Sequence, residues 1–115
     1  MTESLPPLQL VLTTLPDTEA AGRIARGLVE ARLAACVNVL PACHSVYRWQ
    51  GALQEDGEIP LFIKTTPQLY PAVEAYLRQH HPYELPEIIA LDVAAGLPDY
   101  LRWVHEATIP SALPA

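Results

Sequence analysis

Two extended segments separated by a single two-residue turn constrain the fold of this chain more than any other feature. Residues 34–49 have a strand pattern that Pro41 interrupts, residues 52–65 have another, and only Gln50-Gly51 lies between them. A proline within such a run indicates a bulge or an edge position. The turn dipeptide Asp56-Gly57 marks a weak stretch, or a bulge, in the second segment. The pattern predicts a long β-hairpin, and a domain of 115 residues has little surface to cover one.

The rest of the chain alternates between extended and helical patterns. In order, we expect a strand at 8–14, a helix from Asp17 to about Arg32, the two hairpin strands, a helix at 66–81, a strand at 88–94 and a short helix at 98–107. This βαββαβ order with right-handed crossovers predicts an α+β fold, a ferredoxin-like sandwich with an extra C-terminal helix. We expect one domain over residues 1–115, with an ordered core at about 8–107 and a loose tail at 109–115.

Composition excludes several classes of protein. The formal net charge is −6, and the seven Lys and Arg residues are scattered, so nucleic acid is not an expected partner. No apolar run reaches the roughly 18 residues of a membrane span. The first fifteen residues have no basic region before an apolar one, which makes the cytoplasm the expected location. The sequence has no nucleophile elbow, phosphate loop or zinc motif, and we expect no enzyme activity.

The two cysteines do not form a redox motif. Cys36 and Cys43 are seven positions apart, in an apolar stretch. In a reducing compartment, free cysteines behave mostly as small buried hydrophobes. The sequence therefore predicts two buried thiols.

Five motifs in order resemble the CutA family. They are Leu33–Val39 (LAACVNV), Ser45–Gly51 (SVYRWQG), Lys64-Thr65, His81–Ile88 (HPYELPEI) and the stretch from Gly96 to Trp103. The resemblance spans roughly residues 10–104. It implies a homotrimer built through the long hairpin, and a role in tolerance of copper and other divalent cations. The family also resembles the nitrogen-regulatory signalling trimers, which bind small ligands in clefts between subunits.

His80 and His81 are the candidate metal ligands, with Glu87 as a third. Neutral imidazole is a preferred ligand of Cu(II), and the resemblance assigns the histidine pair to copper in some family members. The alternative is that histidines at a helix C-terminus only interact with the helix dipole. Copper-binding members have a cysteine at the position of Thr13, and a hydroxyl is a far poorer copper ligand. The sequence therefore predicts weak binding of Cu(II) or another divalent cation.

A second set of residues predicts a ligand cleft between subunits, lined by aromatic side chains with one cation and a carboxylate. Its members are Tyr47, Trp49, Glu58, Lys64 and Tyr83. The alternative is that the aromatic residues pack at a subunit interface and that Lys64 pairs with a carboxylate. We thus expect a trimeric cation-tolerance protein, and hold a small-ligand signalling trimer and an inert scaffold as alternatives.

Overall fold

The computed structural model describes residues 5–109 and has the predicted order of elements. In chain order they are β1 (Gln9–Leu15), α1 (Thr18–Glu30), β2 (Cys36–Val39), β3 (Cys43–Trp49), β4 (Ala52–Thr65), a 3-10 turn (Pro67–Leu69), α2 (Tyr70–His80), β5 (Ile89–Asp92) and α3 (Pro98–Ala107). The two prolines of the second helical region lie in its first turns, where proline is tolerated. The predicted loose tail falls, from residue 110 onward, outside the described residues.

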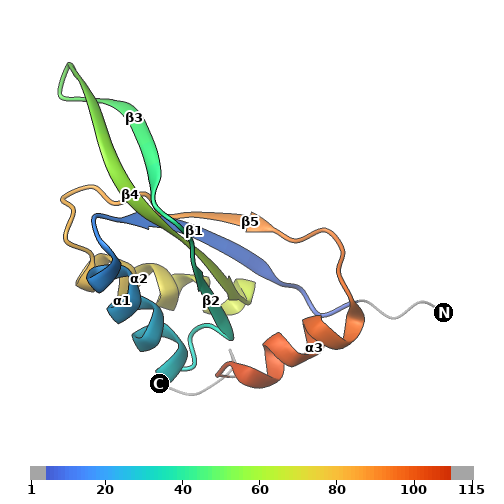
Figure 1. The fold of residues 1–115 in the computed structure, drawn as a ribbon. Helices are drawn as coiled ribbons and strands as arrows, with labels where there is room; N and C mark the ends of the chain where they lie inside the picture. Colours follow the sequence, from blue (N-terminus) through green and yellow to red (C-terminus); the bar gives the residue numbers. More distant parts are fainter. Residues whose placement is uncertain (1–4, 110–115) are drawn as a thin grey trace.

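Strand β4 is the centre of the sheet. Its second half, Ile59–Thr65, pairs antiparallel with β1, and residues 61–64 also pair with β2 on the other side. Strand β5 pairs with the far edge of β1, which gives the order β2-β4-β1-β5. The first half of β4 leaves this sheet and pairs only with β3 (Figure 1). This is the antiparallel sheet of the predicted ferredoxin-like fold.

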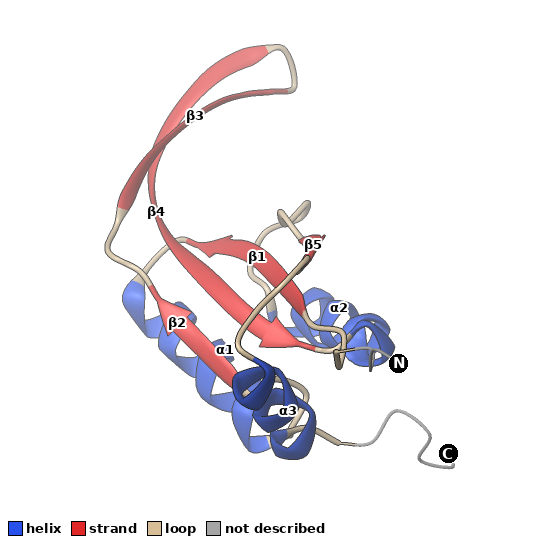
Figure 2. Ribbon diagram, turned by 90° about the vertical axis from the view of Figure 1, so that its right-hand side faces the viewer, coloured by secondary structure: helices blue, strands red, loops and turns tan. Residues whose placement is uncertain are grey.

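Helices α1 and α2 cover one face of the sheet, and α3 lies at one end of the opposite face (Figures 1 and 2). The alternating pattern of the strands decides which residues enter the core. Val11 and Leu15 of β1 and Leu61 and Ile63 of β4 are fully buried against the helices. Their neighbours Leu12 and Phe62 point to the other face, where Phe62 remains 36% exposed. Apart from the end that α3 covers, a large part of this face is therefore apolar and uncovered by its own chain, and we call this part the helix-free face.

Helix α1 starts where the sequence predicts and ends earlier. The Asp17 carboxylate accepts a hydrogen bond of 2.8 Å from the Ala20 backbone N–H. Arg32 has φ +59, and the Leu33 N–H bonds the Leu28 carbonyl, so a left-handed residue terminates the helix. The Arg32 guanidinium donates to the Glu106 carbonyl at 3.1 Å, which ties this corner to the end of α3.

The hairpin has a tight end and one irregularity at its base. Gln50 and Gly51 both have positive φ, as a two-residue turn between paired Trp49 and Ala52 requires. Between the pair of Val39 with Leu61 and the pair of Cys43 with Glu58, the first strand segment has three residues, 40–42, and β4 has two, 59 and 60. One extra residue therefore lies around Pro41. This agrees with the bulge predicted at the proline.

Two expectations about this region are wrong. Asp56-Gly57 makes no bulge, because Asp56 pairs with Ser45 and Gly57 with His44 in unbroken register. The predicted burial of both thiols also fails: Cys43 is exposed on the hairpin and Cys36 is half-buried. The apolar composition of the stretch was misleading, because β3 extends beyond the layer of helices that buries the other strands.

No helix within residues 5–109 combines the length and apolar character needed to cross a membrane.

The contact between α1 and α2 gives a test of the packing. A Cβ added at Gly27 would lie 1.8 Å from the Tyr76 hydroxyl oxygen, so Gly27→Ala must displace a ring that packs on the core. We expect Gly27→Ala to lower the free energy of unfolding by about 1–3 kcal/mol. Gly22→Ala is the matched control, since its Cβ meets only the flexible end of Arg26. It should raise stability by about 0.5–1 kcal/mol. Urea unfolding measures both, and equal effects would contradict the packing.

Candidate functional site

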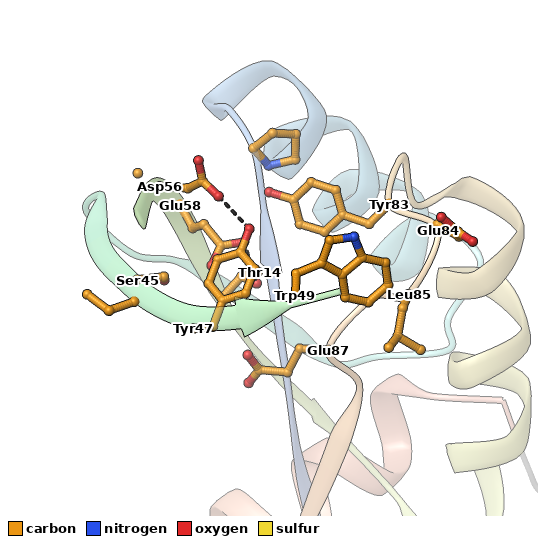
Figure 3. A pocket seen from close by; sticks show the side chains of 13 residues that line it. Thr14, Ser45, Tyr47, Trp49, Asp56, Glu58, Tyr83, Glu84, Leu85 and Glu87 are labelled. Atoms are coloured by element: carbon orange, nitrogen blue, oxygen red, sulfur yellow. Dashed lines mark hydrogen bonds between the residues drawn. The ribbon is translucent and has the colours of Figure 1, made fainter. Parts of the chain in front are cut away.

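A cleft of about 740 Å³ lies between the hairpin and the loop that follows α2. Its lining comes from three parts of the chain: the end of β1, the hairpin strands and residues 83–87. Figure 3 shows the side chains of Tyr47, Trp49, Tyr83 and Glu58 directed into the same space. The full lining is Thr14, Pro16, Ser45, Val46, Tyr47, Trp49, Asp56, Gly57, Glu58, Tyr83, Glu84, Leu85 and Glu87.

Strand alternation explains why these hairpin residues meet. Ser45, Tyr47 and Trp49 are spaced two apart and share one face of β3. Asp56 is paired with Ser45 and lies on that face of β4, as does Glu58 two residues further on. The same face of the sheet continues to Thr14 and then to the apolar, helix-free surface. The cleft is thus the upper end of the face that the helices do not cover.

Hydroxyl groups bond the carboxylates of the cleft. The Thr14 hydroxyl donates to Glu58 Oε2 at 3.1 Å, and the Tyr47 hydroxyl donates to Asp56 (Figure 3). Burial raises the pKa of Tyr83, and its hydrogen bond to the Glu58 carboxylate raises it further. The hydrogen bond to Asp56 likewise raises the pKa of Tyr47. Both phenols therefore stay protonated and act as donors at neutral pH.

The cleft has a strongly negative lining. Four carboxylate residues line it, namely Asp56, Glu58, Glu84 and Glu87. Within the part of the chain that the structure describes, no lysine or arginine is among the lining residues. Glu58 is only 9% exposed, so its charge is poorly solvated. The electrostatics favour a cation in this cleft and disfavour an anion.

Both ring nitrogens of His81 are bonded to the backbone. The Tyr83 N–H donates to Nδ1 at 3.2 Å, so the ring proton is on Nε2, which donates to the Thr14 carbonyl at 2.8 Å. His81 is 8% exposed, and burial lowers its pKa below the usual histidine value. The neutral imidazole thereby ties the loop to β1, beneath the cleft.

His80, a predicted metal ligand, and Thr13, at the position of the cysteine in copper-binding family members, are both separate from this bond network. His80 is exposed and its ring lies against Tyr76, with the ring centres 4.2 Å apart. Thr13 is 1% exposed among core side chains, and its hydroxyl has no hydrogen-bond partner among the described residues. Over residues 5–109, no group of three or more His, Cys, Asp or Glu side chains is arranged to hold a metal ion. Residues 5–109 of a single chain therefore contain no preformed metal site of this kind.

Four of the five predicted cleft residues lie together. Tyr47, Trp49, Glu58 and Tyr83 all line the cleft. Lys64 does not: it lies six residues from Glu58 along β4, roughly 20 Å in an extended strand. It donates there to the Asn38 side chain. Glu87, predicted as a metal ligand, lines the cleft as well.

Eight lining residues were not predicted as cleft or metal residues, namely Thr14, Pro16, Ser45, Val46, Asp56, Gly57, Glu84 and Leu85. Asp56 could have been found, because it lies two residues before Glu58 and so on the same strand face. Thr14 and the two loop residues gave no such signal, since the pairing of β1 with β4 and the course of the loop after His81 bring them here.

Comparison with known proteins identifies the family. Residues 9–107 match the family model described as "CutA1 divalent ion tolerance protein". The chain belongs to the CutA1 family. A divalent-cation tolerance protein CutA from Thermus thermophilus is 48% identical over 100 residues, which cover 87% of this chain and 97% of that protein. Mouse protein CutA is 50% identical over 95 residues, which cover 83% of this chain and 54% of the mouse protein. This chain therefore matches nearly all of the bacterial relative and about half of the mammalian one.

Solved CutA1 structures share the fold. The Thermus thermophilus protein superposes with a TM-score of 0.86 at 48% identity, covering 88% of this chain and 98% of that one. CutA1 from Oryza sativa gives a TM-score of 0.88 at 38% identity, covering 93% and 98%. The family is named for tolerance of divalent ions, and the name indicates no catalytic activity.

The lowered pKa of His81 predicts how stability depends on pH. In the window between the depressed folded value and about 6.5, the unfolded chain binds more protons than the folded one. The contribution of His81 is therefore fully present above about pH 6.5 and is lost as pH falls through the folded pKa.

We expect the free energy of unfolding to be lower at about pH 5.5 than at about 7.5, with a smaller difference in His81→Gln. Denaturant unfolding at both pH values measures this. His80→Gln is the matched control and should retain the wild-type difference. A His81→Gln variant that also retains it would contradict the neutral, bonded state of His81.

Proposed function

We propose that this protein acts in divalent-cation tolerance as a homotrimer that binds cations, copper among them, weakly at the acidic cleft. Membership of the family supports the general role. The binding site, its weakness and the assembly are our proposal. The main support for the binding site is that four carboxylates line one cleft, and that no lysine or arginine is among its described lining residues.

The proposed binding is weak because the carboxylates are not gathered at ligand distances within residues 5–109. A divalent cation in the cleft would keep much of its water shell and interact with Asp56, Glu58 and Glu87 partly through water. Oxygen donors suit hard cations such as Mn(II), while Cu(II) also favours imidazole.

For copper, the proposal retains His80, His81 and Glu87 as candidate ligands. His80 is exposed and does not line the cleft, but it can bind a cation without loss of a hydrogen bond in the described structure. His81 would have to give up its bond to either the Thr14 carbonyl or the Tyr83 N–H. That cost is a further reason to expect modest affinity.

The helix-free face supports the proposed trimer. Leu12 is paired with Phe62 on one side and Ile89 on the other, which forms an apolar row across three strands. Phe62 is 36% exposed and Ile89 48% exposed. A contiguous apolar surface of this kind on a small domain favours burial against another copy.

We also propose the cytoplasm as the location. The two thiols are free, and Cys43 is exposed, which suits a reducing compartment.

A second candidate function is the binding of a small molecule for signalling. The cleft volume of about 740 Å³ is of the size that proteins use for small organic ligands, and far exceeds that of one ion. In the trimer, the mouth of the cleft would lie next to the neighbouring subunit, because it opens on the helix-free face.

Metal titration tests the first candidate. By calorimetry, Asp56→Asn and Glu87→Gln should each weaken Mn(II) binding severalfold, by about 1 kcal/mol. His80→Ala should weaken Cu(II) and leave Mn(II) unchanged. Glu106→Gln, on the exposed side of α3, is the control for net charge. The cleft assignment fails if Glu106→Gln weakens Mn(II) as much as the cleft variants do.

Light scattering tests the assembly. Three chains of 12.6 kDa should give a particle of about 38 kDa. Phe62→Asp should dissociate it, whereas Val29→Asp, at a residue 41% exposed on α1, should not. A stable monomer of the wild-type chain at micromolar concentration would end the proposal.

A further inference from the structure

The acidic cleft combines its carboxylates with aromatic rings. Tyr47, Trp49 and Tyr83 line the same space as Asp56 and Glu58 (Figure 3). Carboxylates alone suit any cation, but the faces of aromatic rings attract cations that carry little water, and stack on guanidinium or methylene groups. A strongly hydrated metal ion gains little from such rings. The lining therefore favours organic cations over metal ions more than a cluster of negative charges alone would.

Glu58 has no counter-charge in residues 5–109. Its side chain is 91% buried, since 9% is exposed, and its partners are the neutral hydroxyls of Thr14 and Tyr83. The ion pairs of the described chain join other residues: Arg23 with Glu19, His44 with Glu55 and Arg102 with Asp99. A buried carboxylate is costly without a positive partner. Two hydroxyl donors leave part of its acceptor capacity unused, so a cationic N–H group can still bind there.

The arrangement of the charges indicates the size of that cation. Asp56 and Glu58 are on the hairpin wall of the cleft, and Glu87 is on the loop wall. The volume of about 740 Å³ far exceeds that of one ion, so an occupant that contacts carboxylates on both walls must be larger than a single ion. A short chain with a positive group at each end could reach both walls. Its methylene groups would then lie against Trp49 and Leu85, which both line the cleft.

We propose that the cleft binds a small organic dication, a diamine or its guanidinium analogue, with one end at Glu58 and Asp56 and the other at Glu87. The ammonium at Glu58 replaces the missing counter-charge. Tyr83 and Trp49 supply ring faces and exclude water. The inference rests on the proposed cation-binding cleft and gives the second candidate function its class of ligand. An anionic ligand such as a nucleotide is excluded by the same carboxylates.

Trp49 serves as the reporter for the test. The chain has two tryptophans, and Trp103 lies on α3 outside the cleft, so Trp103→Phe leaves Trp49 as the only indole. The full chain, in its native assembly and treated with a chelator, is titrated at low ionic strength with 1,4-diaminobutane. Matched probes of similar length are the neutral 1,4-butanediol and the dianion succinate. Fluorescence and calorimetry are recorded together, and light scattering verifies that the assembly is unchanged.

We expect saturable binding of the diamine with a change in Trp49 emission, and none of the diol or the dianion. Glu58→Gln should weaken diamine binding by about tenfold or more, which is the loss of one charge-assisted hydrogen bond. Glu87→Gln, at an exposed residue whose change should not disturb folding, should weaken it about threefold. Glu106→Gln should bind as the parent does.

Equal binding of diamine and diol, or no binding of diamine, would overturn the inference. So would unchanged diamine affinity in both cleft variants. A parallel Mn(II) titration separates this outcome from that of the proposed function. Mn(II) binding without diamine binding rejects only the organic ligand, while diamine binding without Mn(II) binding rejects only the metal role.

Discussion

The pairing of β4 with three strands is the constraint on which the rest of the structure depends. Its fourteen residues form one continuous strand, with one half in the sheet and the other half in the hairpin. Ile59 and Leu61 point toward the helices. Because side chains alternate along one continuous strand, this orientation also fixes the side to which every hairpin residue of β4 points. Asp56 and Glu58 are consequently directed to the helix-free side. A register slip of one residue would move both out of the cleft.

The cleft combines features that are costly in a folded chain unless a partner compensates for them. It has a buried carboxylate at Glu58, rings that remain partly exposed, and an opening toward an apolar surface that no helix covers. In our proposal, a positive ligand would stabilise the first, and a second copy of the chain would cover the last. His81 holds the loop wall in place through two backbone hydrogen bonds, so the imidazole has a structural role in forming the cleft. The proposed metal site and the proposed ligand site thus both depend on the loop being held where His81 places it.

The sequence was sufficient for the fold, because local patterns determine it. The N-cap Asp17, the Gln50-Gly51 turn and the alternation in residues 59–65 each have a direct counterpart in the structure. The long hairpin followed from the two strand patterns and the single turn between them, and the expectation that the chain has little surface to cover it followed from the chain length. The C-terminus of α1 differed because Arg32 adopts the left-handed conformation, which no propensity predicts for arginine.

The site was only partly predictable, because it depends on distances through space. Lys64 and Glu58 share a strand face, yet six residues of extended chain separate them. His80 and His81 are adjacent in sequence, but one ring lies on Tyr76 and the other bonds β1. Thr14 joins the cleft only because β1 pairs with β4. Which residues lie close together depends on strand register and on the path of the loops, and the type of a single residue indicates neither.

Anomalous diffraction from crystals soaked in Mn(II) tests most directly whether the cleft attracts cations. Manganese prefers carboxylate oxygen, so its position reports the acidic lining rather than the histidines. The account predicts a peak between the hairpin and the loop, within reach of Glu58, Asp56 or Glu87 directly or through water. A cleft without a peak, in crystals that bind Mn(II) elsewhere on the chain, would contradict it.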